Sequence, residues 1–330
     1  MAAKINNFAA GIKMEFLELK NIRIDVIKNM YQPFGVSLSV LRLDLIHPHI
    51  SGNKWFKLQG YINKALQYNK SRIVTFGGAY SNHIVATAAA CAATGLAATG
   101  IIRGEEPKEL SPTLLQAQQF GMHLQFVSRE EYRALCKLEV SLDLDCESTL
   151  VIPEGGYGTE GSLGAADILN LFNMRHYSHL IAAVGTGTTL AGMVAGKEMG
   201  QNVLGIAVLK NAGSIESEIN QLLEPHQQNN FQLLHDFHCG GYAKRSKELI
   251  DFMNSFYSET GIPTDFVYTG KLFYGVDQLI RKGFFPENAD ILVLHSGGLQ
   301  GNLSLPKDTL IFSYVCLSKL YLHRYYGLRQ

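Results

Sequence analysis

Ser51-Gly52-Asn53-Lys54-Trp55-Phe56-Lys57-Leu58 is the segment from which the architecture of this chain can be inferred. A Gly-Asn pair precedes Lys54, and an apolar run with approximately helical spacing follows it. Lys54 is therefore expected at a loop-to-helix junction, where its amine can point into a cleft. The simpler interpretation is a solvated lysine at the start of a helix, and Lys57, one turn later, is expected at the surface.

Short apolar strands alternate with helices on both sides of this segment. Helices are expected near residues 55–68, 83–93, 112–120, 188–199 and 244–257, with another ending at Gly283. Strands are expected at residues 22–27, 36–43, 72–76, 96–103, 122–127, 150–152, 180–184, 203–209 and 291–294, and 310–312 could form one more. This alternation predicts parallel βαβ units and hence an α/β protein.

The bulk composition excludes several classes of protein. The 330 residues are 46% hydrophobic and 18% charged, which is typical of a globular chain long enough for two α/β domains. The formal net charge of +0 predicts no nucleic-acid face, and no apolar run reaches membrane-spanning length. Five cysteines without CxxC spacing, and no secretory signal, predict a reduced cytoplasmic protein without a metal centre.

Two glycine-containing turns follow buried strands and could bind anions. Gly77 to His83 precedes an Ala-rich helix, and its free N–H groups could hold a substrate carboxylate, with Ser81 at the reacting centre and Asn82 on a cofactor oxygen. Gly185-Thr186-Gly187-Thr188-Thr189 could cradle a phosphate with backbone N–H groups and hydroxyls. Either segment could instead be an ordinary strand-to-helix turn.

The second turn lacks the patterns of the common nucleotide sites. Leu190 occupies the position where a dinucleotide fingerprint has its third glycine, and no Gly-Lys-Ser/Thr sequence ends the turn as in a P-loop. A lysine in a cleft has a lowered pKa that suits covalent capture of an aldehyde. Pyridoxal 5'-phosphate (PLP) is suggested as the cofactor by the combination of the lysine, the Ser-Asn turn and the phosphate-binding turn.

Six motifs in order carry a family resemblance from about residue 42 to residue 302. They are Gly52-Asn53-Lys54, Gly77-Gly78 with Ser81-Asn82, Pro153-Glu154-Gly155-Gly156, Thr186-Gly187-Thr188-Thr189, Tyr268-Thr269-Gly270-Lys271 and His295-Ser296-Gly297-Gly298. With these motifs the chain resembles fold-type-II PLP enzymes of the 1-aminocyclopropane-1-carboxylate (ACC) deaminase and D-cysteine desulfhydrase family. The resemblance implies a tryptophan synthase β-subunit-like fold: two open twisted parallel-sheet domains, with the cofactor in the cleft between them.

The resemblance also implies a domain division and an assembly. Residues 1–55 with 169–330 would form the large cofactor-binding domain, and residues 56–168 the small α/β domain. Two partners are expected: a second copy of the chain, which forms a homodimer, and a small amino-acid substrate. The apolar segment 320–326 could dock on a lobe or on the second subunit.

The resemblance assigns roles residue by residue. Lys54 looks like the lysine that attaches PLP, and Asn82 like the partner of the ring oxygen. Ser81, Asn82 and His83 look like the substrate-binding turn. The catalytic set is Lys54, Ser81, Tyr242 and Tyr268; the cofactor set is Lys54, Asn82, Gly185, Thr186, Gly187, Thr188, Thr189, Thr269 and Ser296.

Thr269 is the departure that bears on the reaction. In the cyclopropane deaminases of this family a glutamate occupies this position and keeps the pyridine nitrogen protonated, which a hydroxyl does less well. The sequence therefore favours D-cysteine desulfhydrase-like β-elimination to pyruvate, ammonia and sulfide. ACC deamination to 2-oxobutyrate is the alternative, and a PLP-binding regulatory or carrier protein without turnover is an alternative of another class.

Overall fold

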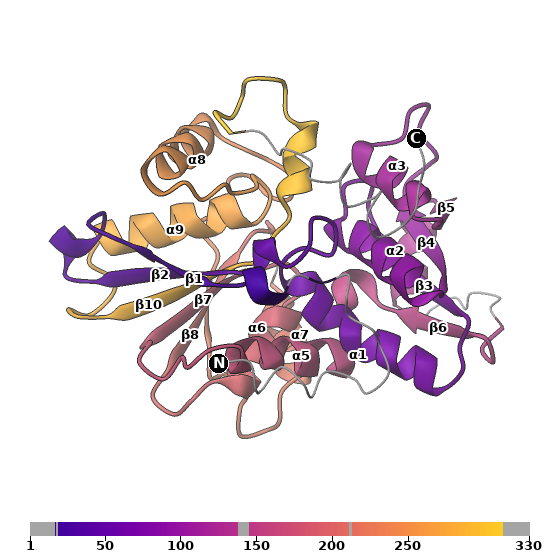
Figure 1. The fold of residues 1–330 in the computed structure, drawn as a ribbon, viewed down its shortest axis with the longest axis horizontal. Helices are drawn as coiled ribbons and strands as arrows, with labels where there is room; N and C mark the ends of the chain where they lie inside the picture. Colours follow the sequence, from indigo (N-terminus) through magenta and orange to yellow (C-terminus); the bar gives the residue numbers. More distant parts are fainter. Residues whose placement is uncertain (1–16, 18, 138–144, 211–212, 313–330) are drawn as a thin grey trace.

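The computed structural model describes residue 17 and residues 19–137, 145–210 and 213–312. Strands from these ranges form two separate sheets, which lie side by side in Figure 1 with helices packed around them. No described helix combines the length and the apolarity that a membrane crossing needs.

The larger sheet has six strands in the order β1-β2-β10-β7-β8-β9. All neighbouring pairs are parallel except β1 and β2, which are antiparallel. The central strand β10 is apolar and buried on both faces, as expected where helices cover both sides of a sheet. The strands are β1 (Ile24–Ile27), β2 (Ser37–Arg42), β7 (His179–Val184), β8 (Asn202–Ala207), β9 (Gln232–Leu234) and β10 (Asp290–His295).

The smaller sheet has four strands in the order β5-β4-β3-β6, and every pairing in it is parallel. Its strands come from one continuous part of the chain, between the strands β2 and β7 of the larger sheet. They are β3 (Arg72–Gly77), β4 (Ala97–Arg103), β5 (His123–Val127) and β6 (Thr149–Ile152).

Nine described helices surround the sheets. They are α1 (Asn53–Gln67), α2 (Asn82–Thr94), α3 (Pro112–Gln119), α4 (Arg129–Cys136), α5 (Thr159–Ala166), α6 (Thr188–Gly196), α7 (Ile215–Gln221), α8 (Lys247–Thr260) and α9 (Thr269–Arg281). Helix α5 packs between α1 and α6, near the middle of the lower half of Figure 1.

Glycines allow the backbones of these three helices to approach closely. A Cβ on Gly164 would lie 1.8 Å from Phe56 O, and one on Gly192 would lie 2.5 Å from Ser162 O. No side chain larger than hydrogen fits at either place without moving backbone. Helices α1 and α6, each of which begins at one of the motifs above, are thereby held in a fixed relation.

The predicted α/β fold with two parallel-sheet units is confirmed, and most boundaries agree within a few residues. Helix α6 ends at Gly196 rather than near 199, because Lys197 is already extended. Residues 310–312 do not form a strand, whereas α4, in a stretch considered weakly patterned, is a helix capped by Ser128. The segment 320–326 lies outside the described residues, and the domain division at 55/56 and 168/169 stays a prediction.

Candidate functional site

A cavity of about 290 Å³ opens between the two sheets. Residues from both sheets and from the loops that connect them line it. All but one of the residues predicted for the site are among them, namely Lys54, Ser81, Asn82, His83, Gly185, Thr186, Gly187, Thr188, Thr189, Tyr242, Tyr268 and Ser296. The exception is Thr269.

Several further lining residues were not predicted from the sequence. Asn53 lies next to the lysine, and Gly78 precedes the Ser-Asn turn. Lys57, Arg103 and Glu154 contribute charge to the cavity wall. Glu154 belongs to a family motif, and only that motif could have predicted its place in the cavity wall. Arg103 ends a strand and belongs to no motif, so its place could not be predicted from the sequence.

Gly52 brings the lysine segment against the last strand of the larger sheet. It is the residue before α1 and has a φ of 69°, which favours glycine. A Cβ at this position would lie 1.8 Å from Ser296 O and 2.5 Å from Gly297 N. The close approach places Lys54, the second residue of α1, in the same cavity wall as Ser296.

The amine of Lys54 lies inside the cavity with one hydrogen bond. Its Nζ donates to Asn53 Oδ1 at 2.6 Å and stands 5.8 Å from the centroid of the Tyr268 ring. Burial lowers the pKa of Lys54 to about 8, although the negative charge of Asp265 opposes this shift. A substantial fraction of the amine is therefore neutral and nucleophilic near pH 8.

We expect capture of PLP by the apoenzyme to follow this pKa. Only the neutral amine attacks an aldehyde, so the second-order rate of absorbance change on adding PLP should rise with pH and level off above about 8. An exposed lysine would give a midpoint near its ordinary value of 10.5. Stopped-flow absorbance across this range measures the midpoint, and a midpoint above pH 10 would contradict the assignment.

Lys57 is buried, and the prediction of a surface lysine is wrong. Its side chain lies under the loop after β6, where Nζ donates a hydrogen bond to Gly155 O. Burial, reinforced by the positive charge of Lys54, holds the pKa of Lys57 well below its usual value. The helical period alone could not show this, because Lys57 is covered by the loop at Gly155 and Gly156, which is distant in the sequence.

The Ser-Asn turn forms the start of α2, and one of its polar atoms has no hydrogen-bond partner. Ser81 is the residue before the helix, and its Oγ accepts a hydrogen bond from Ile84 N at 3.4 Å. Asn82 is buried, and its Oδ1 has no partner among the described residues. Its side-chain amide is thus available to a bound group.

His83 is a neutral imidazole. Its Nε2 lies 2.8 Å from Thr75 Oγ1, which itself donates to Ile152 O, so Nε2 carries the proton. Burial and the charges of Lys57 and Lys54 hold the pKa of His83 well below its ordinary value. Its unpartnered Nδ1 can accept a hydrogen bond. Because the imidazole is neutral, His83 offers no positive charge to a carboxylate.

The Gly185–Thr189 turn offers free N–H groups at the start of α6. Gly187 has a φ of 79°, and the first helical hydrogen bond runs from Ala191 N to Gly187 O. The amides before Ala191 therefore have no partner within the helix. Thr189 Oγ1 accepts from Asn53 Nδ2 at 2.7 Å, which links this turn to the lysine segment.

Tyr242 and Tyr268 face each other at one side of the cavity. Their ring centroids are 6.2 Å apart with an interplanar angle of 71°. Burial raises the pKa of both phenols, so both hydroxyls are protonated at neutral pH. The structure thus brings Tyr242 to the site, although the sequence around it was the weakest of the motifs.

Thr269 lies behind the cavity wall and not in it. Its Oγ1 donates to Asp265 Oδ1 at 2.6 Å, and its N–H donates to the same oxygen at 2.8 Å. The other oxygen of Asp265 accepts from the N–H groups of Val267 and Tyr268. Asp265 therefore caps α9, a role that its position just before the helix could have suggested.

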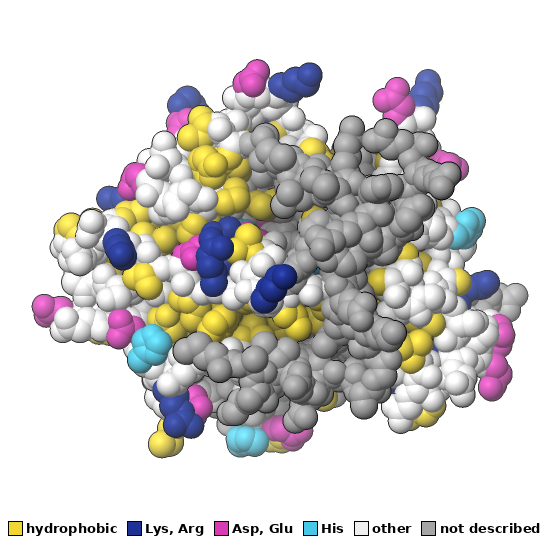
Figure 2. All heavy atoms as spheres, in the orientation of Figure 1, with side chains coloured by type: hydrophobic (Ala, Val, Ile, Leu, Met, Phe, Trp, Pro, Cys, Tyr) yellow, Lys and Arg dark blue, Asp and Glu magenta, His cyan; other side chains and the backbone are white. Residues whose placement is uncertain are grey.

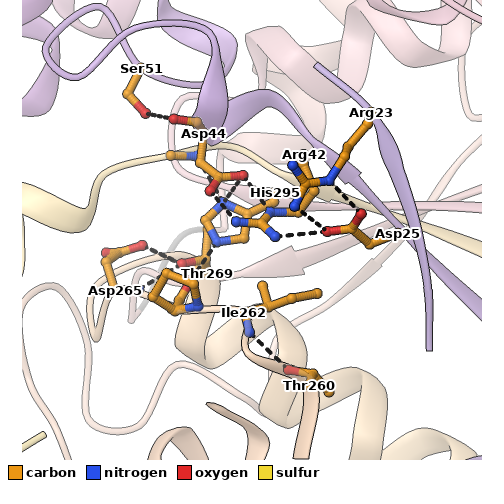
Figure 3. Close-up of polar contacts among 12 residues, drawn as sticks. Arg23, Asp25, Arg42, Asp44, Ser51, Thr260, Ile262, Asp265, Thr269 and His295 are labelled. Carbon is orange, nitrogen blue, oxygen red and sulfur yellow. Dashed lines mark hydrogen bonds and ion pairs between the residues drawn. The ribbon is translucent and has the colours of Figure 1, made fainter. Parts of the chain in front are cut away.

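His295 has the structural role expected for it at the end of β10. Its Nε2 lies 2.7 Å from Pro263 O, and its Nδ1 lies 3.4 Å from Asp44 Oδ1. Asp44 is also paired with Arg42 at 2.7 Å, and Figure 3 shows this network between β2 and the start of α9. It fixes the turn that presents Ser296.

These residues fit PLP by their chemistry. The side-chain amide of Asn82 makes no hydrogen bond with a described residue, so its Nδ2 can donate to a phenolic oxygen, and the free N–H groups at α6 suit a phosphate. Lys54 supplies an amine of lowered pKa for the aldehyde. No group of metal-ligating side chains occurs among the described residues, and the four cysteines described are free thiols.

Comparison with known proteins agrees with this fit. Relatives include the putative ACC deaminases of Thermotoga maritima, 29% identical over 86% of this chain and 96% of that protein, and of Pyrococcus abyssi, 30% identical over 84% and 89%. The mitochondrial bifunctional D-cysteine desulfhydrase/ACC deaminase of Arabidopsis thaliana is 29% identical over 82% of this chain and 74% of that protein.

A crystal structure of an ACC deaminase homologue matches the fold with a TM-score of 0.76 and 27% identity, covering 92% of this chain and 97% of that one. The family model for pyridoxal-phosphate dependent enzymes matches residues 26–297. This match covers most of the chain, including both sheets and every residue predicted for the site. The chain therefore belongs to the family of pyridoxal-phosphate dependent enzymes.

Proposed function

We propose that this enzyme catalyses β-elimination from a small amino acid, most readily D-cysteine, giving pyruvate, ammonia and sulfide. The observation that carries the proposal is the position of Thr269. Its hydroxyl is committed to Asp265, so the Tyr268-Thr269 segment brings no carboxylate into the cavity. A pyridine nitrogen without a carboxylate partner favours loss of a good leaving group over opening of a cyclopropane ring.

The residues predicted for the cofactor, except Thr269, line the cavity and would hold it. Lys54 would attach the aldehyde, Asn82 would bind the phenolic oxygen, and the Gly185–Thr189 turn would bind the phosphate. Ser296 would meet the ring nitrogen with its hydroxyl. Bound in this way, PLP supplies an acceptor for the electron pair left by the broken Cα–H bond.

Two groups are candidates for moving the α-proton. The amine of Lys54 has a pKa of about 8, which is suited to a base near neutral pH. Ser81 stands at the start of α2 and lines the same cavity. Tyr242 and Tyr268 remain protonated because burial raises their pKa values, so their hydroxyls can donate hydrogen bonds to the departing sulfur.

The α-carboxylate of the substrate fits the start of α2. Backbone N–H groups there point toward the cavity end of the helix, and Ser81 adds a hydroxyl. His83 is neutral and its unpartnered Nδ1 only accepts, so it would not bind the carboxylate and could instead accept a hydrogen bond from a donor of the substrate. The substrate is thereby oriented by its carboxylate, leaving its β-substituent toward the tyrosines.

The test is an assay of the PLP-loaded enzyme with D-cysteine, L-cysteine and ACC. We expect sulfide and pyruvate in equal amounts from D-cysteine. The names of the curated relatives favour ACC deamination as the second candidate, for which 2-oxobutyrate would be the product. Release of no product from any of the three would contradict both activities.

Lys271 is expected to position Tyr242. This lysine is fully buried in α9, and its Nζ donates to Gly241 O at 2.6 Å, one residue before the tyrosine. Gly240 and Gly241 have φ values of 92° and 115°, so this bond restrains the backbone at two conformationally free residues. Lys271→Met should lower kcat for D-cysteine by about 10-fold, since loop displacement removes the tyrosine from the substrate.

A double-mutant cycle with Tyr242→Phe separates this role from a general loss of stability. If Lys271 acts through Tyr242, the same lysine replacement should change kcat by less than about 2-fold in the Tyr242→Phe enzyme. Thermal unfolding of all four proteins controls for folding. Equal losses of kcat in both backgrounds would show that Lys271 does not act through this tyrosine.

A further inference from the structure

Arg103 is a charged group in the cavity that the proposed reaction does not use. It is the last residue of β4 in the smaller sheet, and its side chain is exposed to the cavity. A Cβ on Gly78 would lie 3.3 Å from its Nη2, so the guanidinium lies over the turn that begins α2. Ser81 N donates to Gly78 O at 3.0 Å in that turn. The guanidinium thus neighbours the proposed site of the α-carboxylate.

Tyr132 holds the guanidinium from one side. The carbon Cζ of Arg103 stands 5.4 Å from the centroid of the Tyr132 ring, and that ring packs edge-on against Phe76 at 6.0 Å. Tyr132 is only 2% exposed, so it is a fixed platform on α4. Stacking leaves the N–H donors at the edge of a guanidinium available to an anion.

Arg103 has no ion pair or hydrogen bond with any described residue. Glu154 lines the same cavity and is not paired with it. Burial raises the pKa of the Tyr242 phenol. The positive charge of Arg103 opposes this rise, and the negative charge of Glu154 adds to it. Arg103 therefore lies within electrostatic range of the tyrosine that faces the β-substituent.

We propose that Arg103 forms a subsite for a second anionic group, so that the enzyme takes, besides D-cysteine, small amino acids whose β-substituent carries negative charge. The inference rests on the proposed β-elimination and names its substrate class. A guanidinium that faces a cavity, is stacked on a buried ring and lacks an acidic partner is arranged to bind a phosphate ester or a sulfonate, either of which can leave with the electron pair of its bond.

The elimination needs no additional reactant with such substrates. The Cα–H and Cβ–X bonds break, the proton goes to the base, and the anionic group X leaves with the electron pair of its bond. Water hydrolyses the released aminoacrylate. For O-phosphoserine the balance is one substrate and one water giving pyruvate, ammonia and phosphate.

The experiment compares two leaving groups in the PLP-loaded enzyme. The kcat/KM values for O-phosphoserine and β-chloroalanine, each in both enantiomers, are measured for wild type, Arg103→Met, Arg103→Lys and Arg129→Met. The ratio of kcat/KM for the anionic substrate to that for the uncharged one should fall about 30-fold in Arg103→Met, which is the loss expected for one charged hydrogen bond. Arg103→Lys should restore part of this ratio.

Arg129→Met is the matched control for loss of one positive charge, because Arg129 is exposed at the start of α4. It should leave the ratio unchanged. An equal loss for both substrates in Arg103→Met would overturn the proposal, since it would place Arg103 at the α-carboxylate that both substrates share. No O-phosphoserine turnover by an enzyme that consumes β-chloroalanine would also overturn it.

A binding measurement judges the subsite separately from the reaction. Calorimetry of the PLP-loaded enzyme with succinate and with butyrate compares a ligand that has two carboxylates with one that has a single carboxylate. Succinate should bind at least about 10-fold more tightly to wild type and lose this advantage in Arg103→Met. Glu154→Gln should strengthen succinate binding by removing a repulsive charge.

Equal binding of the two acids by wild type would overturn the subsite. Failure to consume β-chloroalanine or D-cysteine, with the preference for succinate intact, would instead overturn the proposed elimination and leave the anion subsite standing. Thermal unfolding of each variant verifies that the compared proteins are folded.

Discussion

Replacing Lys54 with Ala is expected to lower kcat/KM for D-cysteine by at least about 10³-fold, the scale seen when a covalent group is removed from a catalytic set. The amine lines the cavity, is desolvated to a pKa of about 8, and is held by Asn53 Oδ1. Alanine removes both the attachment point of the cofactor and a candidate base. The absorbance band of lysine-bound PLP should disappear together with activity.

Two other lysines of α1 serve as comparisons. Lys64 is exposed and paired with Glu160, so Lys64→Ala should leave both activity and absorbance near wild type. Lys57 lines the same cavity but donates to Gly155 O, so Lys57→Met should disturb the loop while retaining the absorbance band. If the band survived in Lys54→Ala and vanished in Lys57→Met, the attachment would belong to Lys57.

Gly52→Ala is expected to lower the free energy of unfolding by about 3 kcal/mol or more, because positive φ and overpacking both contribute. The new Cβ would lie 1.8 Å from Ser296 O and 2.0 Å from Ser296 C. These are backbone atoms at the end of a central strand and cannot rotate away. The Ser296 turn would be displaced from the cavity, so cofactor affinity should fall as well.

Gly95→Ala separates the two contributions. Gly95 has a φ of 73°, close to the 69° of Gly52, but a Cβ there would meet nothing within 4 Å. Its cost should therefore be backbone strain alone, about 1 kcal/mol. Urea unfolding of the apoenzymes provides both numbers, and equal losses for the two variants would show that contact with Ser296 contributes nothing.

The net charge of zero agrees with the surface seen in Figure 2, where the described basic and acidic side chains on this face are scattered singly or in small groups. Recognition of charge is instead concentrated in the cavity, where Lys54, Lys57, Arg103 and Glu154 meet. The charges that the proposed chemistry would use are therefore those that line this cavity, and the overall field of the protein contributes little.

The sequence alone determined the fold class, the cofactor and most of the residues that line the candidate site. Apolar strands followed by glycine-containing turns and helices specify parallel βαβ units, because both periods and turn chemistry are local properties. Lys54, Ser81-Asn82 and Gly185–Thr189 each stand at such a strand or helix boundary. Parallel topology then brings these boundaries to one side of the sheets.

Only the tertiary structure decided which side chains face the cavity. Lys57 is buried because the loop at Gly155 and Gly156 covers it, Thr269 turns away because Asp265 accepts its hydroxyl, and Arg103 enters the site because Gly78 leaves room beside it. Each outcome depends on contacts between residues distant in sequence or on the direction of a single side chain. Local patterns carry no information about either, so the family could be inferred from the sequence while the substrate subsite could not.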